Sequence, residues 1–516
     1  MPDRVQPPGD AWVRVRREIG TVAGQTPRQV QRRWLRRAGA LLRYHARESL
    51  NPAYRDLIED AGVDPAGPTP RTWHRVPVID KQWLARAGYD RQPACPGPVL
   101  ILGTSGSTAT QVLVPVTAEC AHRGLGDNFL RALLMSGAGP AQRHWGIEHR
   151  PDGQPEHRPD GQPEHRPDGR PQGETGSSIS MTWLARHCGD HALVTAATEP
   201  LPDQLRRAAA FAPDTISGSP GFLSEIARAA GALRPKLLVY GGAALAEADA
   251  ARLRACFPQA RLTAFYPTTD AGALGVAPAG DGVYRTFSET HLIEILDDDG
   301  RPVPAGSRGD VVVTQFGARA APIIRYRVGD RATYRGWEQG RLLLSDIERT
   351  AEAAIGSTLV PYRDLRTWAP RLAARDPSIV AVQLVRACSP GERREQPIVR
   401  VIGRAAPPGS PAPASPAPAS PASGSPASGS PASGSPASGS PASGPAGPES
   451  ARTALAAAAR SLLDDFPQIA SEVASGELAP VLVEFRDPPA TLDGHWKIPL
   501  YVDERTTPEG APCPAD

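Results

Sequence analysis

The sequence predicts an α/β fold with a large N-terminal domain, containing βαβ units and a small barrel, and a small α/β C-terminal domain. Helical and strand patterns alternate along residues 211–270, which is typical of parallel βαβ units. Beyond residue 348 the pattern becomes a compact, strand-rich set with one helix. Because 516 residues suffice for two or three domains, we place the domains at 1–348 and 349–516.

The spacing of apolar residues predicts each of the first alternating elements. Apolar residues at helical spacing predict a helix over 222–227, and the run 237–240 predicts a buried strand that ends at Gly241-Gly242. A helix over 246–256 and a strand over 262–266 follow. Ligands of parallel sheets bind beyond the carboxyl ends of the strands, so we expect a binding edge there.

The later elements change in type. Strands predicted over 291–296 and 310–316 flank a turn at 297–300, which indicates a hairpin or small barrel. The C-terminal domain is predicted from three strands and one helix, over residues 379–386, 397–402, 480–485 and 451–463.

Two low-complexity segments interrupt these domains. Residues 148–171 hold three near-copies of an eight-residue unit rich in Pro and Gly, within an insertion over about 148–176 that we predict to lack regular structure. Tandem duplication explains the histidine in each copy without metal binding. Residues 405–448, with four copies of Pro-Ala-Ser-Gly-Ser, carry almost no apolar side chain larger than alanine and predict a disordered tether inside the C-terminal domain.

Composition restricts the partners. Lys and Arg total 57 against 55 Asp and Glu, so the net charge of +2 gives no bulk reason to expect nucleic-acid or membrane-surface binding. A small molecule or another protein is the expected partner. The six cysteines form no CxxC pair and are predicted to be reduced, and no signal peptide or transmembrane run is evident, so a cytoplasmic location is expected.

A Gly- and hydroxyl-rich turn follows Gly103. It offers flexible backbone amides and several hydroxyls, which suit a triphosphate, although it lacks the Walker A lysine. Taken alone it is also compatible with an ordinary Ser/Gly turn. The candidate phosphate-binding residues are Thr104, Ser105, Gly106, Ser107 and Thr108.

Two acidic residues follow predicted strands. Asp270 is positioned to hold Mg²⁺ beside phosphates, Thr269 could contact the nucleotide, and Tyr266 could stack on a purine. The alternative for Asp270 is a helix cap or a turn. Asp330, after Gly329, suits two ribose hydroxyls, although Gly-Asp turns are common for structural reasons.

These motifs, in this order and with a lone Lys497 near the end, resemble the adenylate-forming superfamily. Within it the sequence resembles the branch of phenylacetate–coenzyme A ligases, coenzyme F390 synthetases and the acyl-protein synthetases of bacterial luminescence. The likeness spans most of the chain. It also includes the segments 42–44, 51–55, 76–81 and 211–220.

The resemblance implies roles for the matching residues. Residues 104–108 would form the phosphate loop, Thr269 and Asp270 would serve phosphate and magnesium, and Lys497 would close over the reacting groups from a mobile C-terminal domain that turns at a hinge near 350–352. The implied nucleotide contacts are Gly241, Gly242 and Ala243 on adenine, Tyr266 stacked on it, and Asp330 and Arg349 on ribose.

The sequence departs from the family pattern at four positions. Ala109 and Pro267 replace glycines, Val112 replaces the lysine of the phosphate loop, and Asp270 replaces a glutamate. Asp can still bind magnesium with a shorter reach, and Pro267 stiffens the wall that faces the acyl substrate. A catalytically decayed nucleotide-binding homologue is therefore one alternative.

The implied reaction uses ATP and Mg²⁺ to convert a small carboxylic acid into an acyl-adenylate, and then transfers the acyl group to a thiol. Coenzyme A is the first expectation for this thiol. The alternatives are the phosphopantetheine arm of an acyl carrier protein, a protein cysteine, or transfer of the adenylyl group to a cofactor.

Overall fold

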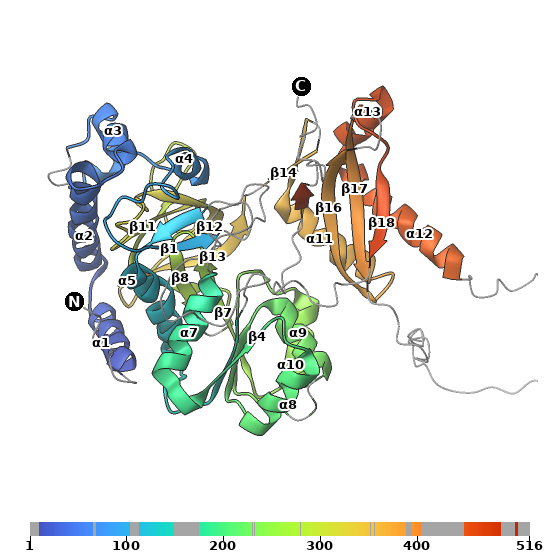
Figure 1. Cartoon of the computed structure of the whole chain (residues 1–516), viewed down its shortest axis with the longest axis horizontal. Coiled ribbons are helices and arrows are strands. Elements are labelled where there is room, and N and C mark those ends of the chain that lie inside the picture. The colour runs from blue at the N-terminus through green and yellow to red at the C-terminus, as the bar shows by residue number, and fades with distance from the viewer. Residues whose placement is uncertain are drawn as a thin grey trace, which may run out of the picture. The chain divides into compact units, whose positions relative to one another are not determined.

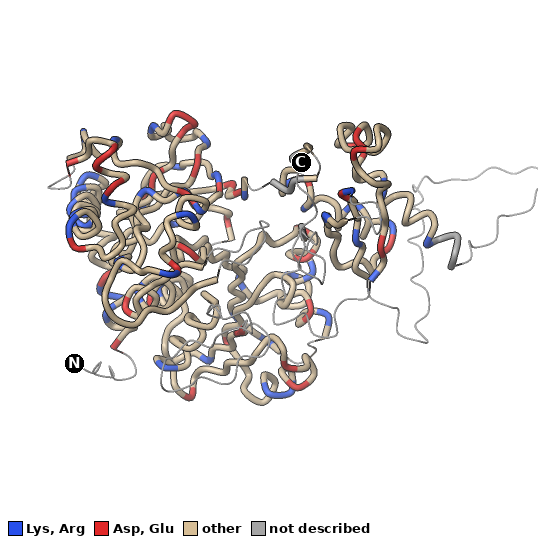
Figure 2. The backbone as a smooth tube through the Cα atoms, turned by 45° about the horizontal axis from the view of Figure 1, so that its top comes forward, with Lys and Arg blue, Asp and Glu red and all other residues tan. Residues whose placement is uncertain are grey.

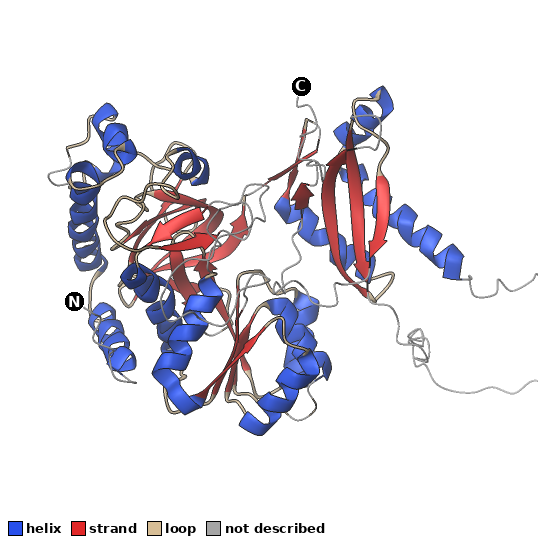
Figure 3. Cartoon of the chain, viewed as in Figure 1, coloured by secondary structure: helices blue, strands red, loops and turns tan. Residues whose placement is uncertain are grey.

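The computed structural model describes residues 10–64, 69–103, 113–148, 175–229, 231, 233–278, 280–350, 352–355, 357–388, 394–403, 448–486 and 501–503. These residues divide into two compact units (Figure 1). The first unit comprises mainly the residues up to Ala354, and the second comprises mainly Arg366–Pro488. Both units combine helices and strands, as the sequence predicted (Figure 3).

The first unit opens with helices that pack on the sheet. Thr26 starts α2 because its hydroxyl accepts the Gln29 backbone N–H while the Gln29 side chain accepts that of Thr26, a capping box followed by Pro27 in the first turn. Asp80 caps α4 through the Trp83 N–H at 2.8 Å. The helices are α1 (Asp10–Ala23), α2 (Pro27–Arg47), α3 (Ala53–Asp60) and α4 (Lys81–Arg86), with a 3-10 turn η1 (Trp73–Arg75).

An eleven-stranded sheet forms the body of this unit, in the order β10-β11-β12-β13-β9-β8-β7-β6-β5-β3-β4. Its parallel part confirms the predicted βαβ units. The parallel strands are β3 (His144–Glu148), β4 (Ala192–Ala196), β5 (Thr215–Gly218), β6 (Leu237–Gly241) and β7 (Arg261–Thr268).

Helices cover both faces of the parallel part. Figure 1 shows α7 on one side and α8, α9 and α10 on the other, so both faces of these apolar strands are buried. The helices of this region are α5 (Ala118–Ala121), η2 (His122–Asp127), α6 (Asn128–Met135), α7 (Gly176–Cys188), η3 (Gly189–His191), α8 (Leu201–Phe211), α9 (Pro220–Ala229) and α10 (Glu247–Cys256).

The sheet becomes antiparallel at β8. The hairpin predicted from the sequence is present as β10 and β11, and it continues the same sheet. A separate pair, β1 (Leu100–Gly103) and β2 (Leu113–Val116), is also antiparallel. The remaining strands of the large sheet are β8 (Gly272–Ala277), β9 (Tyr284–Thr286), β10 (His291–Leu296), β11 (Arg308–Gln315), β12 (Tyr326–Glu338) and β13 (Arg341–Arg349).

The C-terminal region contains more helix than predicted. Its described residues form three α-helices where one was expected, because Pro370 lies inside α11 and Pro467 opens α13, and proline obscures a helical pattern. The helices are α11 (Tyr362–Ala373), α12 (Pro448–Arg460) and α13 (Pro467–Ser475), with η4 (Ser461–Asp465) between the last two.

The strands of this region form two small sheets. One is β14 (Glu352–Ile355) with β15 (Thr358–Pro361). The other has the order β18-β17-β16-β19 and comprises β16 (Ile379–Cys388), β17 (Glu395–Gly403), β18 (Leu482–Arg486) and β19 (Tyr501–Asp503). Cys388 takes part in a disulfide bond, so the prediction that all cysteines are reduced is wrong at this position.

Charged residues of both signs are interspersed along the described parts of both units (Figure 2), in agreement with the net charge of +2. Among the described helices, none is long and apolar enough to cross a membrane. The two low-complexity segments, apart from their end residues, lie outside the described residues.

Candidate functional site

The parallel strands bring two predicted segments together at their carboxyl ends. β6 runs parallel to β7 with Gly241 opposite Phe265, so Gly241 and Gly242 lie beside Tyr266. A Cβ on Gly241 would lie 3.0 Å from the Phe265 carbonyl oxygen, and Gly242 has a φ of +78°. Glycine therefore permits the close approach and the turn at this edge. Ala243 follows on an exposed loop.

A buried tyrosine and a buried carboxylate come from different strands. The Tyr266 hydroxyl donates to Oδ2 of Asp330 at 2.6 Å, and Oδ1 of Asp330 lies 3.4 Å from Nε of Arg349. Asp330 on β12 is directly opposite Arg349 on β13, so the register of this hairpin sets the ion pair. Three of the six residues that the sequence assigned to adenine and ribose are thus connected through Asp330.

The turn between β7 and β8 carries the second carboxylate. Within this turn the Thr268 hydroxyl donates to the Gly272 carbonyl at 2.9 Å and accepts the Ala271 N–H at 3.2 Å. Asp270 is buried, whereas Thr269 beside it is partly exposed. Asp270 lies in a turn and not at the start of a helix, so the cap alternative is wrong.

Tyr326 and Lys81 adjoin Asp270. The Tyr326 hydroxyl donates to Oδ2 of Asp270, and the partly buried Lys81 interacts electrostatically with the same carboxylate. Neither residue was assigned a role from the sequence. Lys81 lies within the segment 76–81 that carried the resemblance, but the contact of both residues with Asp270 depends on long-range pairing that no local pattern reveals.

Long-range contacts place Lys81 there. Ile79 forms a parallel bridge with Tyr326, and its backbone bonds to both neighbours of that tyrosine. The Arg325 guanidinium donates to the Val76 carbonyl at 2.7 Å. The segment before α4 is therefore fastened to the start of β12.

The pKa directions follow from burial and from the two carboxylates. Burial, reinforced by Asp330, raises the pKa of Tyr266, and burial together with Asp270 raises that of Tyr326. Burial alone would lower the pKa of Arg349, but Asp330 and Asp270 outweigh it and raise that pKa. Burial lowers the pKa of Lys81, although Asp270 opposes the shift. Both tyrosines thus stay protonated donors at neutral pH.

Other predicted site residues lie outside the described residues. These are Thr104, Ser105, Gly106, Ser107, Thr108 and Lys497, together with the substituted positions Ala109 and Val112. Pro267, the third substituted position, is partly buried where the register of β7 and β8 shifts.

Two cavities within the described residues are lined by residues other than those of this site. One of about 580 Å³ is lined by α1, the end of α6 and the loop that follows, and one of about 370 Å³ is lined by α11 and the α12 region. Across the same residues no group of three or more His, Cys, Asp or Glu side chains forms a metal cluster. A single carboxylate with phosphate oxygens nevertheless suits Mg²⁺, so Asp270 fits that ion.

The sequence matches no protein-family model and no curated protein. Solved structures do resemble the chain. The crystal structure of 2-hydroxyisobutyryl-CoA ligase in the postadenylation state, in complex with 2-HIB-AMP, covers 91% of this chain and 89% of its own, with a TM-score of 0.55 and 17% identity. AtGH3.15 acyl acid amido synthetase in complex with 2,4-DB covers 98% and 96%, with a TM-score of 0.57 and 13% identity.

These similarities show the fold. The chain shares the α/β fold of these two enzymes, with a large sheet-containing unit and a C-terminal unit, in agreement with the predicted fold class. The finer resemblance to phenylacetate–coenzyme A ligases stays a prediction.

Proposed function

We propose that this protein is an ATP-dependent ligase that activates a small carboxylic acid as an acyl-adenylate and transfers the acyl group to a thiol. The observation that carries the proposal is the contact of Tyr266 and Arg349 with the Asp330 carboxylate, beside Asp270 at the carboxyl end of β7. Ligands of such sheets bind at this edge. The fold shared with 2-hydroxyisobutyryl-CoA ligase supports the same reaction class.

Each residue contributes a distinct interaction. Asp330 offers its carboxylate oxygens to the ribose hydroxyls, and Arg349 pairs with that carboxylate. The Tyr266 ring gives the purine a flat apolar contact. Asp270 and Thr269 face the phosphates, and Lys81 adds positive charge near Asp270. A bound Mg²⁺, which Asp270 would hold, would offset the negative charge that develops on the phosphates.

The first half-reaction follows from this arrangement. An oxygen of the acid's carboxylate attacks the α-phosphorus of ATP, the bond to pyrophosphate breaks, and acyl-AMP forms. Residues 104–108 and Lys497 are proposed to bind the phosphates and the reacting carboxylate. In the second half-reaction a thiolate attacks the acyl carbon and AMP leaves. Coenzyme A is the proposed acceptor, with carrier-protein phosphopantetheine or a protein cysteine as alternatives.

An amine is the second candidate acceptor, since the acyl acid amido synthetase covers nearly the whole chain. A third outcome is adenylyl transfer to a cofactor, in which AMP stays on the product. A decayed homologue would bind ATP without adenylating any acid.

ATP–pyrophosphate exchange with a panel of aromatic and aliphatic acids tests the proposal. Acid-dependent exchange that falls at least tenfold in both Asp330→Asn and Lys497→Ala would support it. Measuring AMP release with coenzyme A, pantetheine or amino acids then identifies the acceptor. ATP binding without exchange across the panel would contradict the ligase assignment and favour the decayed homologue.

A further inference from the structure

A chain of hydrogen-bonded, buried polar side chains contacts the turn that carries Asp270. Nε2 of His291 lies 2.6 Å from the carbonyl oxygen of Ala271, and Nδ2 of Asn128 lies 2.7 Å from that of Ala273. His291 and Asn128 are both fully buried. The two side chains therefore bind the backbone directly after Asp270, in addition to the Thr268 hydroxyl contacts.

The direction of each hydrogen bond is fixed by chemistry. Arg131 can only donate, so the Asn128 oxygen faces it and the Asn128 amide nitrogen faces Thr290 at 2.9 Å. The Thr290 hydroxyl accepts there, and Nδ1 of His291 at 3.0 Å is a closer acceptor for its hydrogen than the Phe287 carbonyl at 3.3 Å. A carbonyl oxygen only accepts, so Nε2 of His291 carries the imidazole hydrogen. Burial lowers the pKa of His291 to about 4, which keeps this neutral form at neutral pH.

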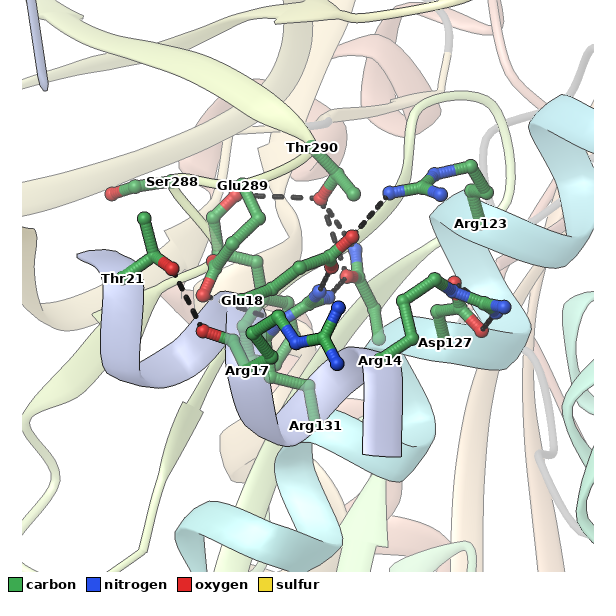
Figure 4. Close-up of polar contacts among 12 residues, drawn as sticks. Arg14, Arg17, Glu18, Thr21, Arg123, Asp127, Arg131, Ser288, Glu289 and Thr290 are labelled. Carbon is green, nitrogen blue, oxygen red and sulfur yellow. Dashed lines mark hydrogen bonds and ion pairs between the residues drawn. The ribbon is translucent and has the colours of Figure 1, made fainter. Parts of the chain in front are cut away.

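Ion pairs anchor the start of this chain. Arg131 contacts Glu18 of α1 at 2.5 Å and Glu289 at 3.4 Å, and Arg341 contacts Glu289 at 2.5 Å. Figure 4 shows Glu18 directed at Arg131 and Arg123. Burial alone would raise the pKa of Glu289, but Arg341 and Arg131 hold it at about 2. Arg131, Glu289 and Arg341 are buried and Glu18 is partly buried, and all four are paired, so Arg131 has little freedom to turn away from Asn128.

We propose that His291 is a positioning residue for Asp270, because it fixes the carbonyl of Ala271 and thereby the orientation of the carboxylate toward the magnesium nucleotide. The chain that sets the His291 tautomer starts at Glu18 and passes through Arg131, Asn128 and Thr290. The role toward nucleotide rests on the function proposed above.

His45 supplies a matched control. It is a second fully buried histidine in the same unit, and its Nε2 contacts a backbone carbonyl, that of Ala318, at 2.8 Å. Burial also lowers its pKa to about 4. It contacts neither the β7–β8 turn nor its neighbours among the described contacts. His45→Leu therefore removes the same kind of group elsewhere.

The experiment compares His291→Leu, His291→Gln and His45→Leu by hydrogen–deuterium exchange and by calorimetric titration with Mg-ATP. His291→Leu should raise exchange in peptides over residues 266–275 and weaken Mg-ATP binding by about tenfold, since it leaves a buried carbonyl without its donor. His291→Gln, whose amide can still donate to Ala271, should restore most of both. His45→Leu should change neither.

A second variant tests the same proposal in case His291→Leu does not fold. Thr290→Val keeps the shape of the side chain but removes the hydroxyl that fixes the imidazole, and should raise exchange over 266–275 to a lesser extent. Unchanged exchange there in every folded His291 and Thr290 variant would overturn the proposal. If the unaltered protein does not bind Mg-ATP, the proposed function fails, while the exchange data still decide the positioning role.

Discussion

The Tyr266 hydroxyl donates to Oδ2 of Asp330 at 2.6 Å across two strands of one sheet. Arg349 contacts the other carboxylate oxygen, so Asp330 is held from both sides. Bonds to an ionised carboxylate are stronger than those between neutral groups. The side chain that we assign to ribose is therefore oriented before any nucleotide arrives, which reduces the ordering cost of binding.

Tyr266→Phe distinguishes the contribution of the hydroxyl from that of the ring. We expect the free energy of unfolding to fall by about 1 to 2 kcal/mol, because Asp330 loses a buried donor. The ring that we assign to purine stacking remains, so the Kd for Mg-ATP should change less than Tyr266→Leu changes it. Urea unfolding and calorimetry measure the two effects. Equal loss of nucleotide binding in both variants would count against stacking.

Asp330→Asn should weaken Mg-ATP binding by about tenfold or more, because the amide nitrogen cannot accept from a ribose hydroxyl and the negative charge that faces Arg349 is lost. Asp310→Asn is the matched control, since Asp310 contacts Arg327 at 3.0 Å on the same sheet. Calorimetry with Mg-ATP and with Mg-2′-deoxy-ATP checks the assignment. Preserved discrimination against the deoxy nucleotide in Asp330→Asn would refute the ribose role.

Asp270→Asn should raise the Mg²⁺ concentration needed for half-maximal pyrophosphate exchange by at least tenfold, because the amide is a weaker ligand for a hard cation. Tyr326→Phe removes only the hydroxyl that orients Asp270, so a smaller change of the same sign is expected. Titration with Mg²⁺ at fixed ATP measures both. An unaltered requirement in Asp270→Asn would assign the metal to another group.

Gly272→Ala should destabilise the protein more than Gly282→Ala does. Both glycines have positive φ, +78° and +70°. Only at Gly272 would the new Cβ meet close atoms, 3.0 Å from the Gly124 carbonyl oxygen and from the Gln315 amide nitrogen. Strained backbone costs each variant about 1 kcal/mol, and the clash adds about 1 to 3 kcal/mol to the first. Equal midpoints in urea would show that the turn can move.

Stability should fall as the pH is lowered from about 6.5 to about 4. Burial lowers the pKa of His45 and His291 from 6.5 to about 4. In this window the unfolded chain binds protons that the native protein does not, and each histidine removes up to about 3 kcal/mol. Urea unfolding at pH 7.5, 6.0 and 5.0 measures the slope. The double variant His45→Gln and His291→Gln should flatten it, and an unaltered slope would contradict the assignment.

Local patterns predicted the parallel part of the sheet well. Strands 237–240 and 262–266 were found as β6 and β7 with small extensions, because strands buried on both faces read as short apolar runs. The helix at 246–256 was found as α10, one residue shorter at its start.

The candidate site was less accessible to prediction. The pairing of Asp330 with Arg349 depends on a hairpin register that shifts twice, at irregularities that no residue pattern marks. Lys81, Tyr326 and His291 reach the turn of Asp270 only through contacts between distant segments. Their residue types are compatible with ordinary core positions, so the sequence alone assigned them no role.

The bond from Arg325 to the Val76 carbonyl also bears on synthesis of the protein. It joins residues 249 positions apart. A ribosome that adds about 5 to 20 residues per second needs about 12 to 50 s to make that stretch. During this interval the emerging segment that precedes α4 lacks the strand to which it is fastened. We therefore expect this segment to be exposed to chaperones and proteases until β12 has left the ribosome.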